Sequence, residues 1–165
     1  MATGRSTQLT RQVGEHLVAA ELGRMGLIAT PFAGNVPHFD LLIANDSGHA
    51  VPVQVKAING PSWQFNASAF LEIHIEDGVQ TVVGANRKVN PKLACVFVLL
   101  REPGKDEFYT LTVADLQALL LKSYKGGRRP KNPESTHCAV WTKDIQHFAG
   151  WACLHSALGQ LNDET

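Results

Sequence analysis

Four residues in the first third of the 165-residue chain have types and spacing that suit a metal site acting on phosphate: Glu15, Asp40, Gln54 and Lys56. Asp40 offers a carboxylate, Gln54 a neutral amide oxygen, and the main-chain carbonyl of Val55 a further oxygen. Mg²⁺ prefers oxygen ligands, usually one or two carboxylates together with water and phosphate. A lysine beside such a metal can orient or activate a water, or stabilise developing negative charge. The set therefore predicts Mg²⁺- or Mn²⁺-dependent chemistry on a phosphate group.

Two predicted strands bring these side chains to one place. Residues 39–44 (FDLLIA) and 50–58 (AVPVQVKAI) are separated by a turn-prone Asn-Asp-Ser-Gly segment, which is typical of a hairpin loop. Gln54 and Lys56 are two residues apart, so both side chains leave the same face of the strand. If the strands pair, Asp40 at the start of the first approaches the end of the second that carries Gln54 and Lys56. We therefore expect one site at that end of the hairpin.

The other predicted elements surround this hairpin. A helix over residues 7–26 has apolar residues at helical spacing and carries Glu15. We further expect a strand at 28–33, an ambiguous stretch at 62–76, an irregular polar segment at 77–92, strands at 93–100 and 107–111, a helix at 113–122 that Thr112 caps, a loop at 123–136, and a helix at 143–158. This order predicts one α/β domain over residues 1–165 with a mixed sheet.

The segments GEHLVAAELGRMG, PHFDLLIA and VPVQVK together resemble the PD-(D/E)XK nuclease superfamily, whose members include Holliday-junction resolvases and small restriction- or homing-type endonucleases. The resemblance covers about residues 8–57. It implies a restriction-endonuclease-like αβββαβ core, with a central mixed β-sheet flanked by helices, and Mg²⁺-dependent hydrolysis of phosphodiester bonds in DNA. It matches Asp40 to the metal-binding aspartate, Lys56 to the catalytic lysine and Glu15 to the acidic residue on the first helix.

Gln54 departs from the usual pattern of that superfamily, in which an acidic residue stands on the third strand. Some members carry a QxK arrangement there, as this chain does. The exchange removes one negative charge from the site, which weakens its attraction for a metal ion. A catalytically weakened scaffold that binds nucleic acid or a protein is therefore the alternative interpretation.

Each of these residues also has an ordinary structural interpretation. Gln54 and Lys56 suit the solvent-facing side of a sheet, Asp40 suits a strand start that caps the preceding turn, and Glu15 suits an exposed helix surface. Trp63 and Phe65 share a face and could stack on unpaired bases, but core packing is the favoured interpretation.

A basic loop follows the predicted helix at 113–122. With two glycines for flexibility, it is a candidate for contacts with a DNA backbone, and a solvated loop is the alternative. Its candidate nucleic-acid-binding residues are Lys125, Arg128, Arg129 and Lys131. Cutting both strands of a duplex takes two active sites, so we expect a homodimer or a higher symmetric oligomer.

The composition narrows the class of protein. Fifteen basic and fifteen acidic residues give zero formal net charge, with 44% hydrophobic residues, which excludes a disordered, collagenous or coiled-coil chain. The zero net charge is also compatible with an interaction domain that does not bind nucleic acid. No apolar run predicts a membrane span, and the N-terminus does not resemble a secretory signal.

Three widely spaced cysteines favour a location in the reducing cytoplasm. The spacing of the histidines and cysteines near the C-terminus fits no common zinc site.

Overall fold

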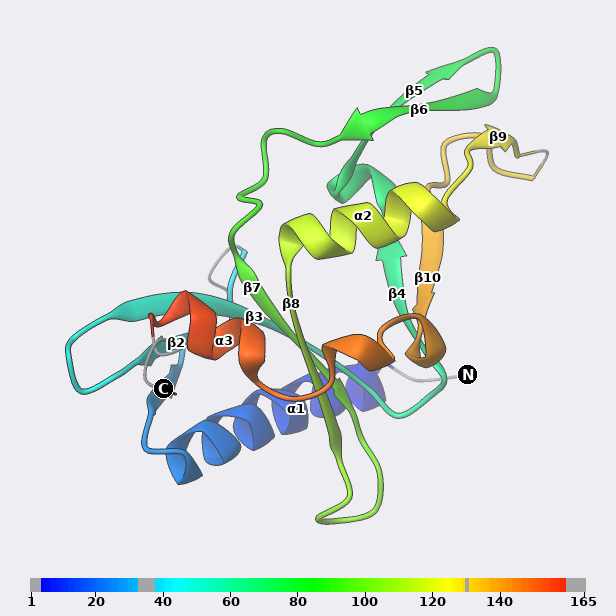
Figure 1. Cartoon of the computed structure of the whole chain (residues 1–165). Coiled ribbons are helices and arrows are strands. Elements are labelled where there is room, and N and C mark those ends of the chain that lie inside the picture. The colour runs from blue at the N-terminus through cyan, green and yellow to red at the C-terminus, as the bar shows by residue number, and fades with distance from the viewer. Residues whose placement is uncertain (1–3, 33–37, 130, 160–165) are drawn as a thin grey trace.

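The computed structural model describes residues 4–32, 38–129 and 131–159, and its centre is a five-stranded mixed sheet (Figure 1). The strand order is β1-β2-β3-β7-β8, and only the pair β3–β7 is parallel. The strands of this sheet are β1 (Ile28–Pro31), β2 (Leu41–Ala44), β3 (Ala50–Ile58), β7 (Ala94–Leu99) and β8 (Glu107–Thr112). The helices that pack against it are α1 (Gly4–Arg24) and α2 (Val113–Ser123). The predicted α/β class with a mixed sheet and flanking helices is confirmed.

The chain leaves the central sheet after β3 and returns to it at β7 through residues 59–93. A parallel pair needs such a long crossover, usually a helix. Here the crossover contains strands and a 3-10 turn, where the αβββαβ order has its helix: β4 (Ser62–Asn66), η1 (Ala67–Ala69), β5 (Leu71–Glu76) and β6 (Val79–Ala85). β4 pairs with β10 (His137–Trp141), and β6 pairs with β5 and β9 (Gly127–Arg128). The sheet of β5, β6 and β9, called the arm below, projects from the rest of the molecule in Figure 1.

The two faces of the central sheet bury separate hydrophobic clusters. Val53 and Val55 belong to the cluster beneath α1, which also contains Leu154 of α3 (Ala152–Ala157). The cluster on the opposite face contains Trp63 and Phe65 of β4 together with α2. These two aromatic side chains are 2% and 7% exposed, so the prediction that they pack in the core is confirmed.

Helix α2 begins where the sequence predicts. Thr112 accepts a hydrogen bond from the backbone N–H of Asp115, and the Asp115 carboxylate accepts one from the backbone N–H of Thr112, which forms a capping box. The helix has eleven residues and covers the face that holds Trp63, because its buried residues include Leu116 and Leu120.

Three expectations for the later part of the chain are wrong. The segment 77–92 contains strand β6, and the loop at 123–136 contains the short strand β9. Residues 137–141, to which the sequence analysis assigns no element, form β10. The expected helix over 143–158 is instead η2 (Thr142–Asp144), η3 (Gln146–Phe148) and the short α3. Gly150 has a φ of +93° and donates its backbone N–H to the carbonyl of Phe108, so pairing with β8 replaces helical hydrogen bonds there.

All three cysteines are free thiols, and burial raises the pKa of each. The pKa of Cys95 reaches about 12 and that of Cys153 about 11. Because the thiolate is the reactive form, we expect a thiol reagent at pH 8 to modify the folded protein at least tenfold more slowly than the urea-unfolded chain. Fast modification of any one thiol in the folded protein would contradict this expectation.

No helix in the described ranges is long and apolar enough to cross a membrane.

Candidate active site

The site begins where β2 and β3 part. Leu41 and Val53 form the last pair of this ladder, and the backbone N–H of Asp40 donates to the carbonyl of Val53 at 2.8 Å. Two residues further along β3, the backbone N–H of Val55 donates to Oδ2 of Asp40 at 2.8 Å. The Asp40 carboxylate therefore replaces a main-chain acceptor at the point where the ladder ends. We call this place the fork.

Helix α1 brings Glu15 to the fork through Arg11. The guanidinium donates from Nε to Glu15 Oε1 at 2.8 Å and from Nη2 to Asp40 Oδ1 at 2.7 Å. The side chains of Glu15 and Asp40 are only 16% and 8% exposed, whereas that of Arg11 is half exposed. The hydrogen bond to Glu15, together with the negative charge of Asp40, raises the pKa of the Arg11 guanidinium. Arg11 thus holds the two carboxylates together and balances part of their charge.

Gly14 makes this approach possible. A Cβ atom at Gly14 would lie 2.3 Å from Cβ of Ala57 on β3, closer than any two such atoms can come. The absence of a side chain therefore allows α1 to lie directly on β3, which brings the next residue, Glu15, towards the fork.

Gln54 and Lys56 lie on the opposite face of β3. They are level with Cys95 and Phe97 of β7 and line a cavity of about 800 Å³. Both side chains are half-buried, and neither makes a hydrogen bond or ion pair with any described residue. Burial raises the pKa of Cys95, and the nearby positive charge of Lys56 opposes that shift, so the ammonium group lies within electrostatic range of the thiol.

The structure therefore connects the four predicted residues in two pairs. Arg11 joins Glu15 to Asp40, and the cavity joins Gln54 to Lys56. The last pair of the β2–β3 ladder is Leu41–Val53, and the backbone N–H of Asp40 donates to the carbonyl of the same Val53. The two pairs therefore lie at the same end of the hairpin, with Asp40 and Glu15 on the side of α1 and with Gln54 and Lys56 on the opposite face of β3.

The oxygen atoms at the fork suit a hard cation. The carboxylates of Asp40 and Glu15 and the Val55 carbonyl are oxygen donors of the kind that Mg²⁺ prefers, whereas the Gln54 amide lies on the opposite face of β3 and lines the cavity. The N–H and carbonyl of one strand residue point to the same side, so the Val55 carbonyl points to the side where β2 has ended. Within the described residues, no group of three or more His, Cys, Asp or Glu side chains gathers for a metal. The candidate site offers two acidic side chains, so any further oxygen donors for a metal ion would be neutral.

The predicted basic loop lies away from the fork. β9 belongs to the arm, and in Figure 1 the arm is on the far side of α2, β4 and β10 from β2 and β3. Lys125, Arg128 and Lys131 are exposed there. Arg129 is half-buried, with its guanidinium 5.0 Å from the ring centre of Tyr124. The structure does not bring these four residues to the site of Asp40 and Lys56.

Two residues that position the site, Arg11 and Gly14, are absent from the sequence-based set. Arg11 stands four residues before Glu15, the spacing at which opposite charges pair on a helix, and this signal could have found it. A glycine in a helix interior costs stability and usually has a packing reason, so Gly14 also carried a signal.

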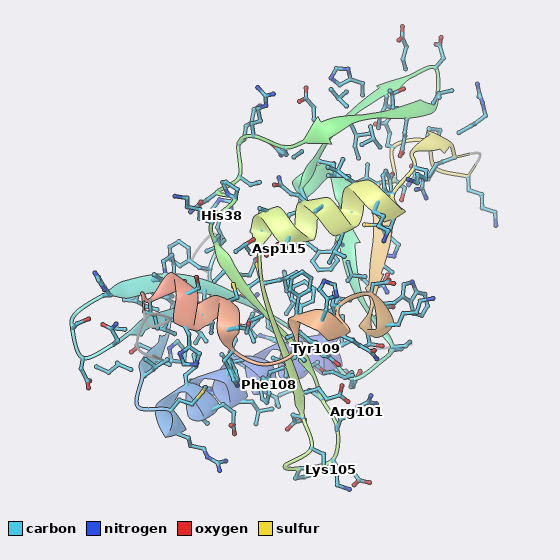
Figure 2. All side chains as sticks on the ribbon, viewed as in Figure 1. His38, Arg101, Lys105, Phe108, Tyr109 and Asp115 are labelled. Carbon is cyan, nitrogen blue, oxygen red and sulfur yellow. The ribbon has the colours of Figure 1, made fainter. Side chains whose placement is uncertain are left out.

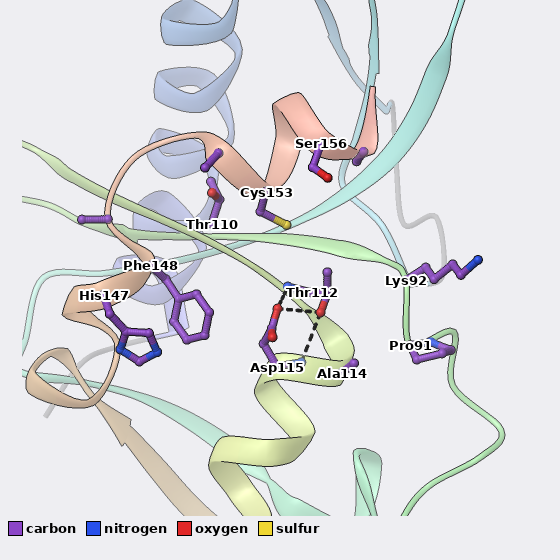
Figure 3. Close-up of a pocket in the computed structure, with 13 residues that line it drawn as sticks. Pro91, Lys92, Thr110, Thr112, Ala114, Asp115, His147, Phe148, Cys153 and Ser156 are labelled. Atoms are coloured by element: carbon purple, nitrogen blue, oxygen red, sulfur yellow. Dashed lines mark hydrogen bonds between the residues drawn. The ribbon is translucent and has the colours of Figure 1, made fainter. Parts of the chain in front are cut away.

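A second cavity, of about 550 Å³, lies between the start of α2 and α3 (Figure 3). Its polar lining includes Asp115, Thr112 and Thr110, and all three already make hydrogen bonds within the protein. None of the predicted site residues lines this cavity. We therefore assign the candidate site to the fork.

A comparison with solved structures gives a match over almost the whole chain. The bacterial homing endonuclease I-Ssp6803I aligns over 97% of this chain and 99% of its own, with a TM-score of 0.51 and 15% sequence identity. The fold is restriction-endonuclease-like. No protein-family model and no curated protein sequence matches the chain. At this identity the likeness establishes the fold, and the chemistry of the restriction-endonuclease-like domain rests on the residues at its fork.

Proposed function

We propose that this protein is a Mg²⁺-dependent endonuclease that hydrolyses phosphodiester bonds in DNA at the fork. The observation that carries the proposal is the position of Lys56, a half-buried lysine that has no counter-charge among the described residues and faces an open cavity at the end of the hairpin where Asp40 lies. A buried charge favours a partner of opposite sign, and a phosphate of the DNA backbone provides one. The likeness in fold to a homing endonuclease supports the same class of substrate.

Each residue has a defined role in this proposal. Asp40, Gln54, the Val55 carbonyl and Glu15 hold the metal ion. A bound Mg²⁺ supplies Lewis-acid polarisation of the phosphate and a water of lowered pKa. Lys56 orients the attacking water and stabilises the negative charge that develops on the phosphate.

The test is cleavage of a DNA panel by the wild type and Lys56→Ala. Linear duplex, supercoiled, branched and single-stranded DNA are incubated with Mg²⁺ or Mn²⁺, with chelator as a control. We expect the wild type to cleave only with metal, and Lys56→Ala to cleave about 10²- to 10³-fold more slowly. Lys105→Ala removes an exposed lysine on the β7–β8 hairpin, whose position in Figure 2 is remote from His38 near the fork, and should cleave like the wild type. Equal rates for Lys56→Ala and the wild type would contradict the role of Lys56.

Two observations favour the alternative of a catalytically weakened scaffold. Arg11 already balances the carboxylates of Glu15 and Asp40, and Gln54 contributes no negative charge. Both features reduce the attraction of the fork for a metal ion. In the same panel, salt-sensitive DNA binding in chelator without cleavage under any metal condition would support this non-catalytic function.

We also propose that the arm contacts the DNA backbone away from the fork, through Lys125, Arg128, Arg129 and Lys131. Each phosphate neutralised releases counterions, so log K falls with log salt concentration by about 0.9 per contact. The double variant Lys125→Ala/Arg128→Ala should reduce that slope by about 2. Lys92→Ala/Lys105→Ala removes the same charge from exposed positions outside the arm and serves as the control. An unchanged slope in the arm variant would contradict this contact.

Three further properties complete the proposal. We propose that residues 1–165 are a single domain, since β7 contributes residues to both hydrophobic clusters. We propose a homodimer or higher symmetric oligomer, because cutting both strands of a duplex takes two sites. We propose a cytoplasmic location, because the three thiols are unpaired.

A further inference from the structure

The cavity beside Lys56 has more features than binding a phosphate requires. We propose that it holds one unstacked nucleotide of the DNA, next to the bond that is cut. The proposal rests on the proposed endonuclease function and names the form in which that site takes its substrate.

The charge of the cavity is positive. Lys56 and Lys88 both line it, and the described residues of its wall include no carboxylate. Lys56 has no partner among the described residues, and Lys88 makes a hydrogen bond only through its backbone N–H, to Asn86. Two free ammonium groups without a counter-charge favour a phosphate-bearing ligand.

Four carboxamide side chains surround the same space: Gln54, Gln64, Asn66 and Asn90. A carboxamide offers a donor and an acceptor side by side, which matches the edge of a nucleobase. Asn66 is exposed and stands at the N-cap of η1 without making a side-chain cap hydrogen bond, so its amide remains available to a ligand. Phosphate binding alone gives no reason for four amides in one cavity.

Aromatic rings form the apolar part of the wall. Phe39, Phe65 and Phe70 line the cavity, and the ring centres of Phe65 and Phe70 are 5.7 Å apart in an edge-to-face arrangement. An aromatic ring supports an unpaired base by stacking, worth about 1–3 kcal/mol per base. The volume of about 800 Å³ is within the usual range for a small-molecule pocket. It is large enough for one nucleotide with some water.

The test measures mononucleotide binding to the full chain in chelator, where cleavage is absent. The four deoxynucleoside 5′-monophosphates, 2-deoxyribose 5-phosphate and inorganic phosphate are each titrated and followed by NMR chemical shifts of the cavity residues. We expect at least one nucleotide to bind about tenfold or more tightly than deoxyribose 5-phosphate, because only the nucleotide carries a base to stack.

The substitution Asn66→Asp places a negative charge at the cavity and should lower the affinity for that nucleotide about tenfold. Asn132→Asp makes the same change at an exposed position outside the cavity and should leave binding unchanged.

Equal affinity for nucleotides and deoxyribose 5-phosphate, or no shift at the cavity residues with any probe, would overturn the proposal. The variant Asp40→Asn distinguishes the nucleotide site from the proposed endonuclease function, because Asp40 does not line the cavity. This variant should lose cleavage and keep nucleotide binding. Base-dependent binding in a protein that cleaves no DNA would support the nucleotide site and contradict the endonuclease. Metal-dependent cleavage without base-dependent binding would contradict the nucleotide site alone.

Discussion

Replacing Asp40 by asparagine is expected to lower the rate of DNA cleavage by about 10³-fold or more, because the buried carboxylate is the acidic ligand at the centre of the proposed metal site. The substitution keeps the size of the side chain but removes its charge. Oδ1 accepts from Arg11 and Oδ2 from the backbone N–H of Val55, and an amide offers a single acceptor oxygen. One of these two donors therefore loses its partner.

The same substitution should reduce the free energy of unfolding by about 1–3 kcal/mol, the usual cost of leaving a buried hydrogen-bonding group unpaired. Urea denaturation measures this change, and calorimetric titration with Mn²⁺ measures the loss of metal binding. Asp106→Asn is the matched control, because Asp106 Oδ1 also accepts from a backbone N–H at 2.8 Å, that of Arg101, on the far β7–β8 hairpin. Cleavage at the wild-type rate by Asp40→Asn would rule Asp40 out as the metal ligand.

Gly14→Ala is expected to destabilise the protein by about 1–3 kcal/mol, although alanine is the better helix former by about 1 kcal/mol. The added Cβ would lie 2.3 Å from Ala57 Cβ, so α1 must move away from β3. Because Glu15 follows directly, this displacement also shifts a proposed metal ligand. We therefore expect a lower cleavage rate as well as lower stability.

Gly23→Ala is the control for this prediction. Gly23 lies in the same helix, and a Cβ built there meets no atom within 4 Å, so the exchange should stabilise the protein by up to about 1 kcal/mol. The double variant Gly14→Ala/Ala57→Gly removes the clash and should recover part of the lost stability. If Gly14→Ala and Gly23→Ala had equal effects on the urea midpoint, the close contact of α1 with β3 would not limit stability.

Local patterns predicted the part of the fold that holds the site. The range predicted for β3, residues 50–58, agrees with the observed strand, because alternating valines and a turn on each side are local signals. The last third of the chain could not be predicted in this way. The apolar spacing around Phe148 and Trp151 resembles a helix, but hydrogen bonds from Gly150 to β8 determine the backbone there. Such pairing depends on residues that are distant in sequence.

The spacing of residues predicted the site only in part. Alternation along one strand correctly indicated that Gln54 and Lys56 share a face, and both line one cavity. The bridge that Arg11 forms between Glu15 and Asp40 depends on how closely α1 approaches the sheet, which Gly14 permits. The position of the basic loop could not be predicted either, because β9 pairs with β6 across a long stretch of sequence.

The parallel pair of β3 and β7 has a consequence for the order of folding. β1, β2 and β3 pair through short antiparallel connections, and α1 contacts the first and third of them, so this half of the sheet can form from neighbouring residues. β7 can join β3 only after residues 59–93 have closed a long loop, and the entropy of closure must be offset by contacts that form later. Docking of β7 is therefore expected to be the slow event in folding. Until it occurs, the half of the sheet with the fork exposes the β3 edge and is open to pairing with the wrong strand.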